Sequence, residues 1–383
     1  MAKVLLVDTN FSSMPIYDAL SAYGHEIHVV GGNASDCLAK ADKKYWPLNY
    51  ANTKLLSELI DEERYDFIVP GCTDRSYASC VEVNRGRFFG LDSHTTEQAL
   101  NNKAKFRELA KKLCIPVPKT QNEAWANLRW PLIVKPVDSF SGKGITVLRE
   151  PDKDKFIEAI QTAKRLSPTG NYLIEDFVEG VLHSHSAFLF QRKIVKDFIV
   201  EERCTVNPFV VDTSRVIHNP NPKILSGLRC AIEAIALELD LNDGLVHVQY
   251  IQNDDDFWLI EITRRCPGDL YSRLIEMSTG YSYADAYVRP YLGLSPDSST
   301  ERSFEKYIMR HTVTVAEEKV YGEISYNYPI WVNSWVSLSL VGDLLKPSPL
   351  SRIGIIFARE ESAQKLNELF QTTITGKLYQ VNY

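Results

Sequence analysis

Residues 245–268 read LVHVQYIQNDDDFWLIEITRRCPG, two apolar runs on either side of a polar, acidic turn at 252–256. Runs rich in β-branched and aromatic residues around such a turn predict a β-hairpin. Gln249 and Glu261 are twelve positions apart, one on each run. In a hairpin of matching register, two such side chains lie on one face, about 5 Å apart.

This predicted pair of side chains suits a hard cation, because Mg²⁺ takes oxygen ligands such as an amide and a carboxylate. Arg265 follows four residues after Glu261 and adds a fixed positive charge, which phosphate chemistry also uses. Ordinary hairpins also carry one inward acid followed by an arginine. The hairpin alone therefore leaves both interpretations open, and the preceding sequence favours the metal site.

A glycine-containing loop lies near the middle of the chain, in PLIVKPVDSFSGKGITVL at 131–148. Short apolar strands are predicted at 132–134 and 145–148, and Lys135 lies on the strand that enters the loop. Glycines let a backbone approach an anion closely, and hydroxyl groups add donors. A hairpin turn can also need glycine for conformation alone. The loop residues expected to face an anion are Ser139, Ser141, Gly142, Lys143 and Gly144.

Residues 171–180 read NYLIEDFVEG and predict a strand that ends at an edge. From Glu175 onward, this edge offers backbone donors and acceptors of the kind that adenine needs, and Ile133, Phe177 and Val178 offer apolar cover. The alternative is a plain strand that ends in a glycine turn.

Taken in order, these motifs resemble the ATP-grasp superfamily of carboxylate–amine ligases, including amino-acid ligases and carbamoyl-phosphate-synthetase-like members. The resemblance covers about residues 95–295, from the helix that carries Lys103 in NNKAKFRELAKKLCIPVP to the paired strands. It implies that Lys103 and Lys135 hold the ATP phosphates under the glycine loop. It further implies that Glu175 and the backbone of Phe177 and Val178 bind adenine.

The same resemblance implies that Gln249 and Glu261 hold Mg²⁺, with Mn²⁺ as an alternative, and that Arg265 stabilises the acyl-phosphate step. The sequence departs from the family pattern at three positions. Thr263 replaces the usual Asn. We predict it as a third metal ligand, weaker because a hydroxyl is a poorer oxygen donor than an amide. Gln249 replaces the commoner Glu. Leu182 stands where an acid usually binds ribose, which leaves Glu179 or His183 as substitutes.

The activity implied is that of an ADP-forming carbon–nitrogen ligase that activates a small-molecule carboxylate as an acyl phosphate and joins it to an amine. An amino acid is the expected substrate. A related route transfers bicarbonate-derived carboxyphosphate to a nitrogen acceptor. The alternative from another class is an ATP-binding regulatory protein of the same fold without ligase turnover, which the changes at Thr263 and Leu182 keep open.

The composition is that of an ordinary soluble chain, with 383 residues, 44% hydrophobic residues and a net charge of −6. Slight acidity argues against nucleic acid as a partner, because phosphate contacts need clustered Lys and Arg. No run approaches the roughly 18 apolar residues of a membrane span. The seven cysteines include no Cys-x-x-Cys pair, which indicates reduced thiols and a cytoplasmic protein. A homodimer is expected from the family.

The predicted fold is mixed α/β and α+β in three domains. Residues 1–102 alternate strands and helices and predict a Rossmann-like parallel sheet, whose loops 8–13 and 71–75 face one crevice, with Ser12 and Ser13 as helix caps. Residues 103–296 form the ATP-grasp module of two α+β lobes: 103–180 bears the lid loop and 181–296 bears the metal strands, with 207–222 irregular. Residues 297–383 form a small β-rich domain. Its resemblance to the end-domain of purine-pathway family members implies that Arg352 reaches the substrate or the ADP phosphate, and a plain surface charge is the equally weighted alternative.

Overall fold

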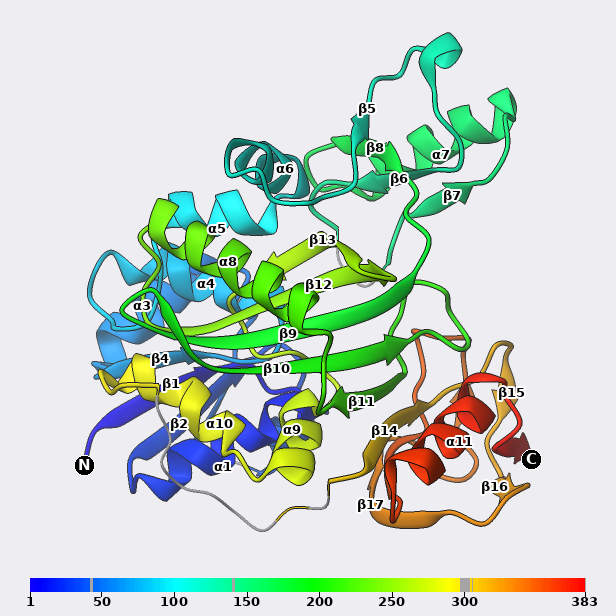
Figure 1. Cartoon of the computed structure of the whole chain (residues 1–383). Helices are drawn as coiled ribbons and strands as arrows, with labels where there is room; N and C mark the ends of the chain where they lie inside the picture. The colour runs from blue at the N-terminus through cyan, green and yellow to red at the C-terminus, as the bar shows by residue number, and fades with distance from the viewer. Residues whose placement is uncertain (42–43, 140–141, 297–303, 305, 383) are drawn as a thin grey trace.

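The computed structural model describes residues 1–41, 44–139, 142–296, 304 and 306–382. Three main sheets organise these residues (Figure 1). One is parallel and two are antiparallel, and helices cover them, so the predicted mixed α/β and α+β class is confirmed. Within this part of the chain, no helix has the length and apolar character that crossing a membrane would require.

The N-terminal sheet is parallel, in the order β3-β2-β1-β4, as the alternation of strands and helices predicts. Its strands are β1 (Lys3–Val7), β2 (Glu26–Gly31), β3 (Tyr45–Pro47) and β4 (Phe67–Pro70). Its helices are α1 (Met14–Ala22), α2 (Cys37–Ala41), α3 (Thr53–Glu63) and α4 (Asp74–Asn84), with the short 3-10 helix η1 (Phe11–Ser13) before α1. Four successive residues of β1 are fully buried, which explains why that run is continuously apolar.

The capping expected of Ser12 and Ser13 is wrong. Ser13 stands at the N-cap of α1 but makes no side-chain capping bond. Its hydroxyl donates to Asp8 Oδ2 instead (2.8 Å), and Ser12 Oγ accepts from the distant Asp269 N–H (3.1 Å). Ser13 Oγ also accepts from the Cys72 N–H (3.0 Å), so the two hydroxyls join the loop after β1 to the loop after β4 and to the segment around Asp269.

A smaller antiparallel sheet, in the order β5-β8-β6-β7, projects from the rest of the molecule (Figure 1). Its strands are β5 (Thr120–Gln121), β6 (Leu132–Pro136), β7 (Thr146–Leu148) and β8 (Tyr172–Asp176), and the helix packed on it is α7 (Lys153–Leu166). Phe156, Ala159 and Ala163 of α7 pack against Leu132, Val134 and Ile174. Before this lobe come α5 (His94–Asn101), α6 (Lys103–Lys112) and, inside it, η2 (Trp125–Asn127).

The largest sheet is antiparallel and has the order β13-β12-β9-β10-β11-β14-β19-β17. Its first five strands are β9 (Val181–Phe190), β10 (Lys193–Arg203), β11 (Thr213–Ile217), β12 (Gly244–Asn253) and β13 (Asp256–Thr263). The helix α8 (Pro222–Glu238) covers one face of this sheet (Figure 1). The predicted hairpin is confirmed as β12 and β13, with Gln249 directly opposite Glu261.

One expectation about this sheet is wrong, because residues 207–222 are not wholly irregular. They contain β11, which pairs with β10 and with the later strand β14. Thr213 and Ser214 of β11 are fully buried although they are polar. A strand whose buried positions are polar gives no alternation of apolar and polar residues, and prolines and asparagines before and after it conceal it further.

The C-terminal strands β14 (Ile308–Val313), β17 (Trp331–Ser337) and β19 (Gly354–Arg359) extend the large sheet. This sheet therefore runs across the boundary predicted at 297, and the division there stays a prediction. The helix α11 (Ala363–Ile374) packs on these strands through Leu366 and Phe370. The remaining elements are α9 (Tyr271–Thr279), α10 (Tyr283–Val288), η3 (Arg289–Leu292), β15 (Lys319–Val320), β16 (Glu323–Tyr326), β18 (Leu344–Leu345) and β20 (Tyr379–Asn382).

Candidate active site

A cleft of about 1100 Å³ lies where the three sheets meet. Its walls come from the loops after β1 and β4, from the small lobe, from the hairpin and from C-terminal arginines. The predicted site residues that line it are Lys103, Lys135, Gly142, Glu175, Phe177, Val178, Gln249, Glu261, Thr263 and Arg265. Ser139, Lys143 and Gly144 are described but do not line it, and Ser141 lies outside the described residues.

Lys103 joins the glycine loop to the hairpin. It is the first residue of α6, whose N-terminus is capped by the Asn102 carboxamide. Its Nζ donates to the Ser139 carbonyl (3.1 Å) and lies 3.5 Å from Glu261 Oε1. A single ammonium thus lies between the segment expected to cover phosphates and an acid expected to hold a metal.

Lys135 and Glu175 form a buried ion pair. Lys135 is 6% exposed on β6, and its Nζ lies 2.5 Å from Glu175 Oε2 on β8. Arg107 of α6 donates its Nε to the other carboxylate oxygen (2.5 Å). Burial lowers the pKa of Lys135 to about 8, although Glu175 opposes that shift. Burial would raise the pKa of Glu175, but Lys135 and Arg107 together hold it below its usual value. Both partners therefore stay charged near neutral pH.

Arg107 was missed from the sequence. It is four residues after Lys103 on the same helix, so the two side chains share one face. Its Nη2 also donates to the carbonyl of Ile260 (3.0 Å). The hairpin register shifts immediately beside Gln249, so that Ile260 has no direct partner, and such a bulge leaves backbone groups free for other donors. Arg107 thereby connects Glu175 to the β12–β13 hairpin.

Gln249 and Glu261 line the cleft from adjacent strands. Glu261 is 39% exposed at its side chain, and the Gln249 amide donates its Nε2 to Glu202 Oε2 (2.7 Å). Across the described residues, no group of three or more His, Cys, Asp and Glu could hold a metal. Two hard oxygen ligands nevertheless fit Mg²⁺, which usually keeps waters and binds one or two protein ligands plus substrate phosphates.

Arg265 and Thr263 both contact Asp74, an acid at the start of α4 in the N-terminal sheet domain. Arg265 donates Nε to Asp74 Oδ1 (2.8 Å) and Nη2 to Oδ2 (2.9 Å), while the Thr263 hydroxyl donates to Oδ1 (3.3 Å). Arg265 holds the pKa of Asp74 below its usual value against the opposing effect of burial. The sequence placed residues 71–75 at the crevice but did not identify Asp74 as the partner of Arg265.

His247 shares the cleft face with Gln249 and accepts or donates a hydrogen bond with Ser186 Oγ through Nδ1 (2.8 Å). Burial, reinforced by the charge of Arg265, lowers the pKa of His247 to about 3. The imidazole is therefore neutral at physiological pH and does not add charge to the cleft.

The edge expected to meet adenine has one donor already in use. The Phe177 N–H donates to the Pro131 carbonyl (3.0 Å). Among the described residues none accepts from the Val178 N–H, so this is the donor available to a base. Glu179 lines the cleft and pairs with Arg149 (2.6 Å), whereas His183 stacks on Tyr250 and does not line it. Of the two ribose candidates, Glu179 is the one at the cleft.

Two C-terminal arginines reach the opposite end of the cleft. Arg352 Nη1 lies 2.9 Å from Asp269 Oδ1, and the buried Arg310 donates to the Asp269 carbonyl (3.0 Å). Both arginines line the cleft. Arg352 therefore lies at the cleft wall, and its contact with a substrate stays a prediction.

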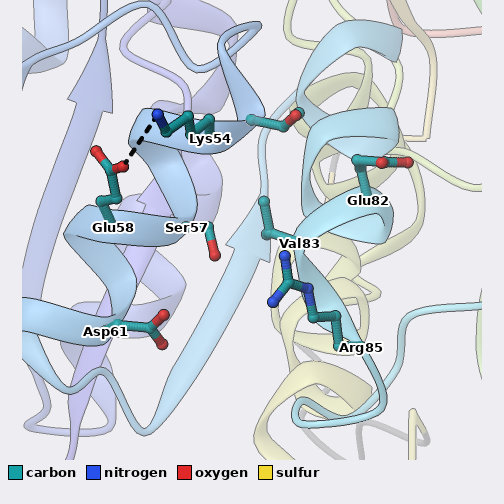
Figure 2. A pocket seen from close by; sticks show the side chains of 8 residues that line it. Lys54, Ser57, Glu58, Asp61, Glu82, Val83 and Arg85 are labelled. Atoms are coloured by element: carbon teal, nitrogen blue, oxygen red, sulfur yellow. Dashed lines mark ion pairs between the residues drawn. The ribbon is translucent and has the colours of Figure 1, made fainter.

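A second, smaller hollow of about 360 Å³ lies between α3 and α4 (Figure 2). Its rim carries charged side chains, including Lys54 and Glu58, whose charged atoms lie 4.0 Å apart. It contains none of the predicted site residues, and its charges face solvent.

Comparison with known proteins adds to this geometry. Residues 100–268 match the family model of the ATP-grasp domain. This segment of the chain therefore carries an ATP-grasp domain. It is 29% identical over 207 residues to a phosphoribosylamine–glycine ligase of Pyrococcus furiosus, across 51% of this chain and 47% of the relative. It is also 29% identical over 187 residues to a formate-dependent phosphoribosylglycinamide formyltransferase of Stutzerimonas stutzeri, across 46% and 47%. The chain spans about half the length of the curated relatives it matches.

Solved ATP-grasp structures share the whole fold. An L-amino acid ligase from Bacillus licheniformis superposes with a TM-score of 0.77 at 15% identity, covering 100% of this chain and 99% of that one. A phosphoribosylglycinamide synthetase from Anaerococcus prevotii gives a TM-score of 0.74 at 17% identity, covering 100% and 99%. At such low identity these likenesses establish the fold and leave the substrates open.

Proposed function

We propose that this protein is an ATP-dependent, ADP-forming ligase that activates a small-molecule carboxylate as an acyl phosphate and joins it to an amine. The observation that carries the proposal is the common cleft, in which two lysines, an oxygen pair suited to Mg²⁺ and an arginine converge. These groups come from α6, from β6 and from the hairpin with the segment that follows it, so their convergence depends on the whole fold.

Each group has a distinct task in the proposed reaction. Lys103 and Lys135 bind phosphate oxygens of the nucleotide, and the Glu175–Arg107 pair holds the Lys135 ammonium in place. Gln249 and Glu261 hold Mg²⁺, which neutralises charge on the transferring phosphoryl group. Arg265 stabilises the charge that develops on the same group, held in orientation by Asp74.

The chemistry proceeds in two displacements. A carboxylate oxygen of the substrate attacks the γ-phosphorus, the bond to the β-phosphate oxygen breaks, and ADP leaves. The amine nitrogen then attacks the acyl carbon, inorganic phosphate departs and the nitrogen gives up a proton. Acyl phosphates hydrolyse in water, so the loop at 138–144 is proposed to close over the nucleotide during turnover.

An amino acid is the proposed substrate class. The names of two similar proteins include one, glycine in the ligase of Pyrococcus furiosus and an L-amino acid in the ligase of Bacillus licheniformis. Arg310 and Arg352 beside Asp269 give the distal end of the cleft both signs of charge, which a zwitterion would complement.

The test is ADP release from MgATP against a panel of carboxylates and amines, with amino acids in both roles. We expect release that requires one acid and one amine together, with formation of an amide. ADP release that no carboxylate stimulates, or phosphoryl transfer to a hydroxyl acceptor, would exclude the ligase.

A second candidate is an ATP-binding regulator without turnover. The observation that favours it is that Thr263 and Arg265 are both bonded to Asp74, so that neither is presented solely to the nucleotide. Tight MgATP binding with no turnover for any acid and amine pair would support the regulator over the ligase.

A further inference from the structure

The amide of Gln249 has a defined orientation. Its nitrogen donates to Glu202 Oε2 at 2.7 Å. An ionised carboxylate only accepts hydrogen bonds, so it meets the NH₂ end of an amide and excludes the oxygen end. Amide orientation in a protein is decided by such a network. The contact with Glu202 therefore turns the Gln249 oxygen away from Glu202, and among the described residues none donates to that oxygen.

Glu202 is itself held in place. It lies on β10, which is separated from β12 by β9, so its side chain reaches across the intervening strand. It is 4% exposed, and burial raises its pKa, an effect that the neighbouring side chains of Ser184 on β9 and Gln249 oppose. Ser184 is the register partner of Gln249 on β9. Three adjacent strands thus contribute one side chain each to a fixed arrangement at the cleft wall.

The orientation matters only because residue 249 is a glutamine. A glutamate has two equivalent oxygens, and either one can face a cation. An amide has one oxygen and one NH₂ group, and only the oxygen is a ligand for Mg²⁺. A free amide at this position would spend part of its time with the wrong end toward the metal.

We propose that Glu202 is a positioning residue, which fixes the Gln249 amide so that its oxygen faces the cation beside Glu261. This rests on the proposed function, since it assumes that the hairpin pair holds the metal of a bound nucleotide. Outer partners of this kind fix the geometry of metal ligands, and their loss typically weakens metal binding by about 10–100-fold.

The test measures how much Mg²⁺ strengthens ADP binding, by isothermal titration with Mg²⁺ and with EDTA. Glu202→Gln and Glu202→Asp are compared with the unsubstituted protein. Glu202→Gln replaces a side chain that can only accept hydrogen bonds with one that can also donate, and Glu202→Asp keeps the charge on a side chain shorter by one methylene. Glu202→Gln is also introduced into Gln249→Glu, where no amide needs orientation at position 249, and that double variant is compared with Gln249→Glu alone. Metal-free ADP affinity, which should stay constant, reports that the cleft remains intact.

We expect Glu202→Gln and Glu202→Asp to reduce the Mg²⁺-dependent gain about tenfold or more in the Gln249 protein. We expect no reduction from Glu202→Gln when residue 249 is Glu. An equal loss in both backgrounds, or full retention by Glu202→Asp, would mean that Glu202 acts only through its charge and would overturn the proposal. Mg²⁺-dependent binding in the unsubstituted protein with no effect of either substitution would also overturn it. Absence of any nucleotide binding would reject the proposed function itself.

Discussion

The lowered pKa of Lys135 predicts that nucleotide binding, if this lysine holds phosphate as proposed, depends on pH. Its pKa is lowered to about 8, mainly by burial, whereas an unfolded lysine titrates near ~10.4. Between these values the unfolded chain binds more protons, so the contribution of this group to stability rises with pH in that window. The charge available for phosphate falls over the same window.

ADP affinity should therefore decrease above about pH 8. In Lys135→Arg the decrease should be absent, because a guanidinium keeps its charge. Titration calorimetry about one pH unit below and above that value measures both proteins. The same pH dependence in both would show that Lys135 is not the group responsible.

Substitution of Arg265 and substitution of Asp74 should lower the reaction rate by different amounts. Arg265→Ala should raise the activation free energy by about 3 kcal/mol or more, because it removes the charge proposed to stabilise the transition state. Asp74→Asn keeps Arg265 but releases its bidentate partner, so kcat should fall by up to about 10²-fold with ADP affinity unchanged.

The control for this comparison is Asp18→Asn, which removes another Asp–Arg contact between α1 and α9 (2.8 Å, to Arg273) outside the cleft. Steady-state kinetics should show no change in Asp18→Asn. Equal kcat values in the unsubstituted protein and Asp74→Asn would refute the positioning role of Asp74.

The positions of residues at the cleft were predictable where a residue stands in a local pattern, as Lys103, Lys135 and Glu261 do. Asp74, Glu202 and Arg107 were not, because each acts through a partner far away in the chain. The distance of Asp74 from Arg265 in sequence, for example, leaves no local signal. Only Arg107, four residues from Lys103, had a spacing that could have revealed it.

At the scale of elements, the loop between β6 and β7 depends on its two glycines. Gly144 has φ +77°, and a Cβ there would lie 2.8 Å from the Pro136 ring. Gly144→Ala should therefore distort the loop and weaken ADP binding. Gly170→Ala is a matched control in the same lobe, with φ +71° and nothing within 4 Å of the added carbon.

Both changes carry the backbone cost of an L-residue at positive φ, about 1–2 kcal/mol, so both should lower the midpoint of thermal unfolding slightly. Only Gly144→Ala should also lower ADP affinity in a titration. Similar affinity losses in the two variants would show that the effect comes from stability and not from the loop.

The hairpin β12–β13 was predictable as an element, since its turn and its alternation are both local. The bulge beside Gln249, which sets Gln249 opposite Glu261, was not predictable from them. The strand β11 was not predictable, because two of its three buried residues, Thr213 and Ser214, are polar and their burial depends on β10 and β14. Hydrophobic patterns in a sequence indicate only where apolar side chains are buried. A strand that buries mostly polar side chains is therefore not predicted from them.

For the whole molecule, the large sheet joins the C-terminal strands to the metal-bearing strands. Removing residues from 304 onward would expose the edge of β11 and delete Arg310 and Arg352 from the cleft. We expect the shortened chain to lose its cooperative thermal transition, followed by circular dichroism. A shortened chain that unfolds cooperatively and binds ADP as the full chain does would instead support an independent domain after 297.

The parallel sheet and the order of lobes followed from local signals, whereas the meeting of three sheets at one cleft is a property of the assembled chain. The most direct measurement is a crystal structure with ADP and Mn²⁺, in which anomalous scattering locates the metal. We predict a manganese peak between Gln249 and Glu261, with the nucleotide phosphates against Lys103 and Lys135. Nucleotide or metal bound elsewhere, with this cleft empty, would contradict the account.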